Sequence, residues 1–349
     1  MATQQLRELL KDTIFSLPWQ TKLQPTLPAE RVSSVLHEPA ILGGYRVPHK
    51  PWMYYFFSLF QLHNETVNVW THLIGCCVIL HKMYGYFDEF DLESDNVLST
   101  LIAFGISSLV GLFTSAMVHL VHGKSSYVHF IAFMVDYIGV SIMGVGHGVA
   151  MHYGVSQKQF YTDWDGLFLP CLMVVAYLNF LNLCLAKIWY GHDPHNMKRK
   201  YMFLGGMWCQ AMVNVAPFAP KYVDCLKDDA SCPWTSVNYT TIITLVFFVA
   251  AFLFAAHQPE KTWPGKFDIF GHGHQIFHVF IIVNHVLQMD VVYIDHVTGY
   301  NRHGEPNFAA IVLLMAALYA AEVLTLAYLK RYVPACLKRV EEAECHKDD

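Results

Sequence analysis

Three stretches of the sequence place ionisable or hydroxyl side chains inside apolar runs. Ser115 and His119 are four residues apart in TSAMVHL, and His274 and His278 are four residues apart in GHGHQIFH. A spacing of four puts both members of a pair on one face of a helix. Asp136 lies in MVDYIG, within a third apolar run. Because ionisable groups are costly inside a membrane, each of these is a candidate functional residue.

The composition indicates that the apolar runs cross a membrane. Of the 349 residues, 54% are hydrophobic and only 15% are charged, whereas about 25% are charged in an average soluble protein. These values do not fit an ordinary soluble domain. The net charge of −5 offers no basic surface for nucleic acid, so we expect no nucleic-acid partner. Residues 1–20 lack the apolar run and cleavage site of a secretory signal, so we expect insertion through internal spans.

Runs of about 20 apolar residues predict membrane-spanning helices. Eight such runs cover residues 66–87, 97–121, 127–152, 166–187, 200–219, 239–257, 272–294 and 307–329. The predicted fold class is all-α, a polytopic membrane helical bundle with a seven-helix core and an eighth, C-terminal transmembrane helix.

The distribution of basic residues predicts the orientation of the bundle. Eighteen Lys and Arg residues lie in the N-terminal region, the tail and the loops on that side, whereas four lie in the alternate loops. The positive-inside rule therefore predicts cytosolic N- and C-termini. Cys225 and Cys232 then share a loop outside the cytosol, where a disulfide between them is chemically permitted.

This orientation brings four candidate residues to a similar depth in the cytosolic leaflet. His119 ends the second span, Asp136 lies early in the third, and His274 and His278 open the seventh. Three imidazoles, a carboxylate and an open coordination position for water are what a catalytic zinc centre needs. The alternative is a polar network with a purely structural role.

The other polar residues are assigned structural roles. Near the start of the first span, we interpret His63, Asn64, Glu65, Asn68 and His72 as a polar network with Arg46. His122 and His129 lie near span ends, where contact with lipid headgroups is expected.

The predicted organisation has four regions. Residues 1–65 form a cytosolic N-terminal region with an interfacial segment at 51–63, and residues 66–294 form the seven-helix core with the zinc site. Residues 295–329 supply a loop and the eighth helix, and residues 330–349 form a charged, loosely ordered cytosolic tail.

Several of these stretches resemble the progestin and adipoQ receptor family in order and spacing. They are YRVPHKPWMYYFFSLFQLHNETVNVWTHLIG, TSAMVHL, MVDYIG and FDIFGHGHQIFH, and the resemblance covers residues 38–294. The family shares its pattern of Ser-x3-His, Asp and His-x3-His with a wider membrane hydrolase superfamily that includes the alkaline ceramidases. The resemblance implies that His119, His274 and His278 bind Zn²⁺. It also implies that Asp136 orients or deprotonates the water on the zinc and that Ser115 hydrogen-bonds to Asp136.

Within the family, the chain resembles the membrane progestin receptor-like branch. The features that carry this are the short N-terminal region, the stretch PGKFDIFGHGHQIFH and the eighth apolar run. The resemblance implies a receptor of the cell membrane that binds progestin-type steroids and signals rapidly and non-genomically, with a heterotrimeric G protein as partner. The extra run after the seventh span departs from the adiponectin receptors, so the location of the C-terminus does not carry over from them.

Three interpretations of the metal site follow. In the first, a steroid or other lipid ligand binds an apolar cavity and shifts a conformational equilibrium, with Asn182, Gln210 and Asn214 either anchoring the ligand or joining helices. In the second, the protein is a ceramidase-like, zinc-dependent lipid amidase in which Asp136 takes a proton, and ligand binding can gate it. In the third, the metal only ties helices together.

Overall fold

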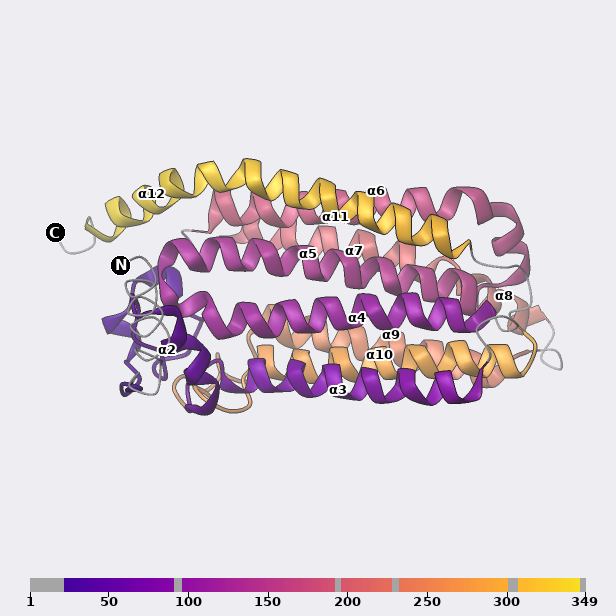
Figure 1. Cartoon of the computed structure of the whole chain (residues 1–349), viewed down its shortest axis with the longest axis horizontal. Helices are drawn as coiled ribbons and strands as arrows, with labels where there is room; N and C mark the ends of the chain where they lie inside the picture. The colour runs from indigo at the N-terminus through magenta and orange to yellow at the C-terminus, as the bar shows by residue number, and fades with distance from the viewer. Residues whose placement is uncertain (1–21, 91–95, 192–195, 228–231, 301–306, 346–349) are drawn as a thin grey trace, which may run out of the picture.

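The structure, a computed structural model, is an all-α bundle. It describes residues 22–90, 96–191, 196–227, 232–300 and 307–345, so parts of the predicted N-terminal region and tail lie outside the described residues. Each of the eight predicted runs coincides with a helix (Figure 1). They are α3 (Thr66–Glu89), α4 (Asn96–Val121), α5 (Ser126–Ala150), α6 (Lys158–Tyr190), α7 (Met197–Val215), α9 (Trp234–Ala256), α10 (Gly273–Val297) and α11 (Phe308–Leu329).

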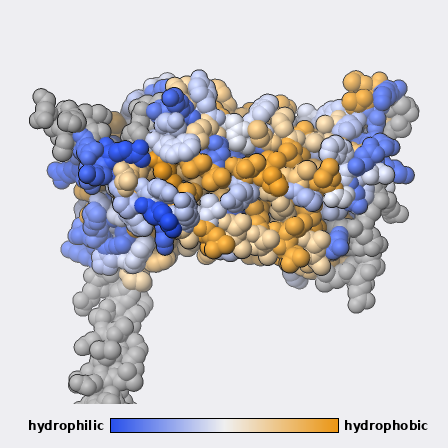
Figure 2. Space-filling view, turned by 90° about the horizontal axis from the view of Figure 1, so that it is seen from above, coloured by the Kyte–Doolittle hydropathy of each residue, from blue (hydrophilic) through white to orange (hydrophobic). Residues whose placement is uncertain are grey.

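The bundle is built to cross a membrane, which confirms the predicted fold class. Within the described residues, six helices are long and apolar enough to span it, namely α4, α5, α6, α9, α10 and α11. The other two, α3 and α7, run alongside them (Figure 1). In Figure 2, apolar side chains gather in the middle of the length of the bundle and hydrophilic ones at both ends. The protein is therefore a multi-pass membrane protein.

Helix packing separates a central group from a peripheral group. α4 packs between α3 and α5, α10 packs between α3 and α9, and α6 packs against α5, α7 and α11. In the most apolar 18-residue stretch of α4, 61% is buried inside the bundle, whereas only 17% is buried in the corresponding stretches of α9 and α11. The two peripheral helices therefore turn most of their apolar surface outward, as expected for helices that face lipid.

Two glycines let α4 and α5 approach closely. A Cβ atom added to Gly111 would lie 3.0 Å from the backbone oxygen of Gly139, and one added to Gly139 would lie 3.4 Å from the Cα of Gly111. Small residues at a crossing point allow the backbones of membrane helices to pack tightly. This contact positions the C-terminal half of α4 beside the first half of α5, which are the parts that carry Ser115, His119 and Asp136.

We call the end of the bundle at which α3 begins the proximal end, and the end that carries α8 (Ala219–Lys227) the distal end. The segment before α3 folds over the proximal end. Within it, α2 (Trp52–Phe57) buries Tyr54 and Tyr55, while Trp52 stays half exposed. The predicted interfacial segment thus packs its tyrosines against the bundle and leaves other aromatic side chains outside.

The tail after α11 forms a helix instead of the loose segment that its charge suggested. In α12 (Val333–Cys345), Val333, Cys336 and Val340 are buried against Phe130 of α5. Their spacing of three and four residues makes an apolar stripe along one face of the helix. Charge content alone concealed this stripe, which holds α12 at the proximal end (Figure 1).

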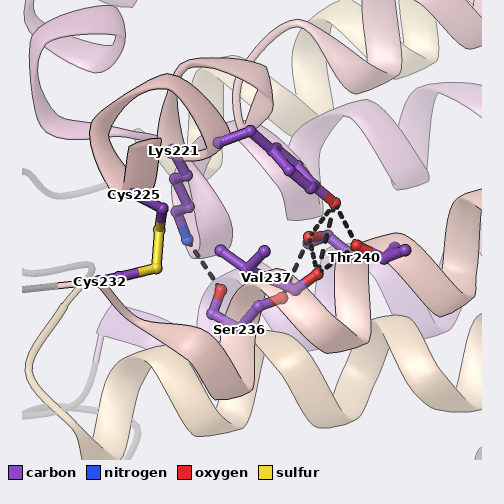
Figure 3. Close-up of a disulfide and its surroundings, with 8 residues drawn as sticks. Lys221, Cys225, Cys232, Ser236, Val237 and Thr240 are labelled. Atoms are coloured by element: carbon purple, nitrogen blue, oxygen red, sulfur yellow. Dashed lines mark hydrogen bonds between the residues drawn. A yellow bond between two sulfur atoms is a disulfide. The ribbon is translucent and has the colours of Figure 1, made fainter. Parts of the chain in front are cut away.

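At the distal end, a disulfide and a buried ion pair hold α8, α9 and α10 together. Cys225 and Cys232 are joined by a disulfide, and Lys221 points toward Ser236 beside it (Figure 3). The Lys221 Nζ lies 2.6 Å from Oδ2 of Asp295 and 3.0 Å from Oγ of Ser236. Both charged side chains are almost fully buried, so neither is stabilised by water.

We expect the variant Lys221→Met to be less stable by about 3–5 kcal/mol, because removing one partner leaves the carboxylate of Asp295 buried without its counter-charge. The double variant Lys221→Met/Asp295→Leu should recover most of this loss. Thermal unfolding of the purified variants in detergent measures both. Equal unfolding temperatures for Lys221→Met and the wild type would contradict a stabilising role of the pair.

Candidate metal centre

The three predicted histidine ligands meet at the proximal end of the bundle. His119 lies near the end of α4, and His274 and His278 lie in the first two turns of α10. The Nε2 atom of His274 lies 3.1 Å from Nε2 of His119 and 3.0 Å from Nε2 of His278. One nitrogen from each ring thus falls within 4.8 Å of the others, as ligands of a single metal ion do.

Contacts on the opposite side of the rings fix which nitrogens carry hydrogen. The Nδ1 of His119 lies 2.7 Å from Oε2 of Glu65, and the Nδ1 of His278 lies 3.2 Å from the backbone oxygen of Asn68. Both oxygens are acceptors, so both Nδ1 atoms donate and the Nε2 atoms keep their lone pairs. Two lone pairs then face His274, whose Nε2 can carry only one hydrogen. A cation between the three rings satisfies all of them, so these residues fit a metal ion.

The start of α10 is held in place by the loop that precedes it. The backbone N–H of Gly273 donates to Oε2 of the buried Glu260, at 2.7 Å. A carboxylate at a helix N-terminus pairs with an N–H that has no partner within the helix and with the helix dipole. A Cβ added to Gly273 would lie 2.6 Å from the backbone oxygen of Gln258, so only glycine fits next to the candidate ligand His274.

Arg46 holds the end of α4. Its guanidinium is buried, and it donates to the backbone oxygen of His119 at 2.7 Å and to that of Leu120. These carbonyls are among those that a helix end leaves without an internal partner. Burial lowers the pKa of Arg46 to about 10, so the side chain is still charged at neutral pH. The candidate ligand His119 is thus fixed through its backbone as well as its ring.

Glu65 receives several donors at once. Besides His119, Nδ2 of Asn68 donates to its Oε2 at 2.6 Å, and Nε2 of His122 lies 3.3 Å from its Oε1. Burial opposes ionisation of this carboxylate, but His119 and His122 hold its pKa well below the usual range. An ionised acceptor behind a ligating histidine orients the ring and raises its basicity.

Ser115 and Asp136 lie together beside the three histidines. The Ser115 hydroxyl of α4 hydrogen-bonds to the Asp136 carboxylate of α5, and Asp136 interacts electrostatically with His119. Asp136 is not among the residues whose ligand atoms cluster within 4.8 Å of one another in the described part of the chain. Its Oδ1 is buried without a hydrogen-bond partner. This oxygen is free to accept a hydrogen from a molecule bound next to the histidines.

Sequence reasoning gave the surrounding polar residues only a structural role, and several of them contact the ligands. Glu65 and Asn68 bond to ligating histidines, and the ring of His72 stacks on that of His278 with centroids 3.6 Å apart. The signal was present in HNETVNVWTH, where positions 65, 68 and 72 share one helix face of an otherwise apolar run. That face points at the end of α4 and at α10.

The expectation that His122 and His129 contact lipid headgroups is wrong. Both side chains are buried, at 3% and 4% exposure. The reason is that the N-terminal segment and α12 cover the proximal end, which hydropathy along single helices does not reveal. Two of the three polar residues named as anchors or helix joints connect helices: Asn182 of α6 donates to the Met202 carbonyl of α7, and Asn214 of α7 donates to the Gly144 carbonyl of α5. Gln210 donates to Asn214 within α7 itself.

Comparison with known proteins agrees with the resemblance. The profile of the family described as Haemolysin-III related matches residues 60–289. Membrane progestin receptor beta of Mus musculus is 34% identical over 339 residues, 95% of this chain and 94% of that protein. The Homo sapiens beta receptor is 33% identical over 96% of this chain and 95% of that protein, and the Danio rerio alpha-B receptor is 30% identical over 97% and 96%. The chain therefore belongs to the Haemolysin-III-related family, in the membrane progestin receptor-like branch of the progestin and adipoQ receptor family.

Proposed function

We propose that this protein is a receptor of the cell membrane for progestin-type steroids, with a zinc ion bound by His119, His274 and His278. The observation that supports the zinc site is the convergence of the Nε2 atoms of the three histidines. In two of these rings, the Nδ1 atom already donates to an acceptor on the other side. The receptor function is supported by relatives named membrane progestin receptors, to which this chain is similar along nearly its whole length.

Zinc is the metal that these ligands favour. In a tetrahedral zinc site with Zn–N distances of about 2.0–2.1 Å, two nitrogens lie about 3.3 Å apart. The separations of 3.0 and 3.1 Å to His274 are close to that value. Neutral imidazoles also avoid burying net charge inside the bundle before the metal arrives, which thiolates or several carboxylates would not.

Both termini are proposed to be cytosolic, which puts the zinc at the cytosolic end. The excess of Lys and Arg on the proximal side supports this orientation, and the Cys225–Cys232 disulfide lies at the opposite end. A steroid in the membrane would then act on the cytosolic face through the helices that carry the metal. A heterotrimeric G protein is the proposed partner there, on the strength of the family resemblance.

A zinc-dependent lipid amidase is the second candidate function. The observation that favours it is the unpartnered Oδ1 of Asp136 beside the histidines. A bound zinc ion would supply Lewis acidity toward a carbonyl oxygen and acidify water. Asp136 would take the proton of the attacking water, and the Ser115 hydroxyl would hold the carboxylate in place. A lipid amide can reach such a site from the leaflet without leaving the membrane.

We expect one zinc ion per chain in the purified protein and none in His278→Ala. The matched control is His152→Ala, which removes a buried histidine that is stacked on Phe168, outside the metal-site cluster. Elemental analysis after gel filtration in detergent measures the stoichiometry. A folded wild-type protein without zinc would refute the proposed centre.

Glu65→Leu should weaken zinc binding roughly 10- to 100-fold, the usual effect of losing a direct partner of a metal ligand, whereas Glu65→Gln should lose less. The amide oxygen of glutamine still accepts from His119, but it lacks the charge. Competition with a zinc chelator gives the affinities. Equal affinity for Glu65→Leu and the wild type would show that the carboxylate does not support the metal.

Two assays separate the receptor from the amidase. We expect zinc-loaded protein in lipid nanodiscs to bind radiolabelled progesterone saturably, and Asp136→Asn to bind it equally well. An amidase would release fatty acid from ceramide in liposomes and lose that activity in Asp136→Asn. Absence of saturable steroid binding would contradict the receptor proposal. If the wild type releases fatty acid no faster than Asp136→Asn does, the amidase proposal is wrong.

A further inference from the structure

A row of buried polar side chains joins α6 to the candidate metal centre. Lys187 of α6 places its Nζ 3.0 Å from Nε2 of His129 in α5. The Nδ1 of His129 lies 3.2 Å from Nδ1 of His122, which is in the turn after α4. His122 and the ligand His119 then contact the two different oxygens of Glu65.

The hydrogens in this row all point the same way, from Lys187 toward Glu65. A lysine amine next to an imidazole nitrogen donates, so Nε2 of His129 is the acceptor and its hydrogen is on Nδ1. This hydrogen points at Nδ1 of His122, so the hydrogen of His122 is on Nε2 and faces Glu65. The last contact, at 3.3 Å, has the distance of an ion pair without good hydrogen-bond angles, so it is the loosest of the row.

Every imidazole in the row is therefore neutral, with one nitrogen donating and the other accepting. The direction ends at Glu65, whose Oε2 accepts from His119 and whose Oε1 lies 3.3 Å from Nε2 of His122. A carboxylate with a hydrogen bond to one oxygen and a polar N–H close to the other is held in one orientation. Glu65 in turn keeps the hydrogen of His119 on Nδ1 and leaves Nε2 for the metal.

We propose that Lys187, His129 and His122 are positioning residues for the metal centre, which act on the ligand His119 through Glu65. This inference rests on the zinc site of the proposed function. It differs from a second metal site made of Glu65, His119 and His122, whose ligand atoms also lie within 4.8 Å of one another. Such a site would displace the two hydrogens that these histidines direct at Glu65, and it would use both nitrogens of His119.

The outer end of the row is covered by α12 and two aromatic rings. The Lys187 side chain is 5% exposed, and its Nζ lies 5.0 and 4.7 Å from the ring centroids of Phe130 and Phe133. Cys336 and Val333 of α12 pack in the same cluster as Phe130. In this dry surrounding, water does not compete for the hydrogen that Lys187 directs at His129.

The test compares the zinc affinities of variants by competition with a chelator in detergent micelles. We expect Lys187→Met and His129→Phe each to weaken binding by about 3- to 10-fold, less than the loss of a direct partner. Lys187→Arg, which keeps a cationic donor, should lie nearer the wild type than Lys187→Met. The control His152→Phe replaces a buried histidine at the distal end and should bind zinc as the wild type does.

A double-mutant cycle shows whether Lys187 and His129 affect zinc affinity through the same chain of contacts. If Lys187 acts through His129, then Lys187→Met has no further effect on affinity in the His129→Phe background, whereas independent structural effects add. Co²⁺ loaded in place of zinc gives a second readout, because its visible absorption reports ligand geometry. The band should shift in His129→Phe but not in His152→Phe.

The outcomes distinguish this inference from the function on which it rests. A wild-type protein that takes up no Zn²⁺ overturns both. The positioning role alone is overturned if the wild type binds zinc and Lys187→Met and His129→Phe bind it with the same affinity. It is also overturned if the effects of the two substitutions add in the double-mutant cycle. Two zinc ions per wild-type chain, with one lost in His122→Phe, would replace it by the second metal site.

Discussion

The hydrogen bond between Glu65 and His119 is the interaction on which the proximal end depends. It joins the start of α3 to the end of α4, and it decides which nitrogen of His119 faces His274 and His278. An ionised carboxylate and an imidazole buried in an apolar bundle stay in place only if each has the other as a partner. Arg46 and Asn68 complete this arrangement, so the candidate ligand His119 is oriented by groups from the segment before α3 and from the first turn of α3.

Buried charge is concentrated at the two ends of the bundle and serves a different purpose at each. At the distal end, Lys221 and Asp295 neutralise each other beside the disulfide, and Oδ2 of Asp295 also accepts from Ser236, while its Oδ1 accepts no hydrogen bond. At the proximal end, the Nε2 lone pairs of His119 and His278 face a His274 nitrogen that can give a hydrogen to only one of them, and Oδ1 of Asp136 has no donor. The first pattern is that of a structural joint, and the second is that of a site that receives something.

The sequence predicted what is local and missed what depends on packing. His119, His274 and His278 were found because a spacing of four within an apolar run is visible in the chain itself. The bond from Glu65 to His119 spans 54 residues and exists only because α3 packs on α4. The predicted fifth span ran to residue 219, but α7 ends at Val215, since Pro217 cannot continue a helix. α6 begins at Lys158 instead of residue 166, because its first two turns, which carry Lys158 and the exposed Asp165, lie outside the apolar run and are still helical.

The docking of α12 has a chemical consequence for the thiol that it carries. Cys336 is fully buried between Val333, Phe130 and the neighbouring helices. A thiol must reach both a base and an incoming reagent before it can be acylated, oxidised or alkylated. Covalent modification of Cys336 therefore reports undocking of α12 from the bundle, and the rate at which an added thiol reagent labels it measures how often that helix leaves its place.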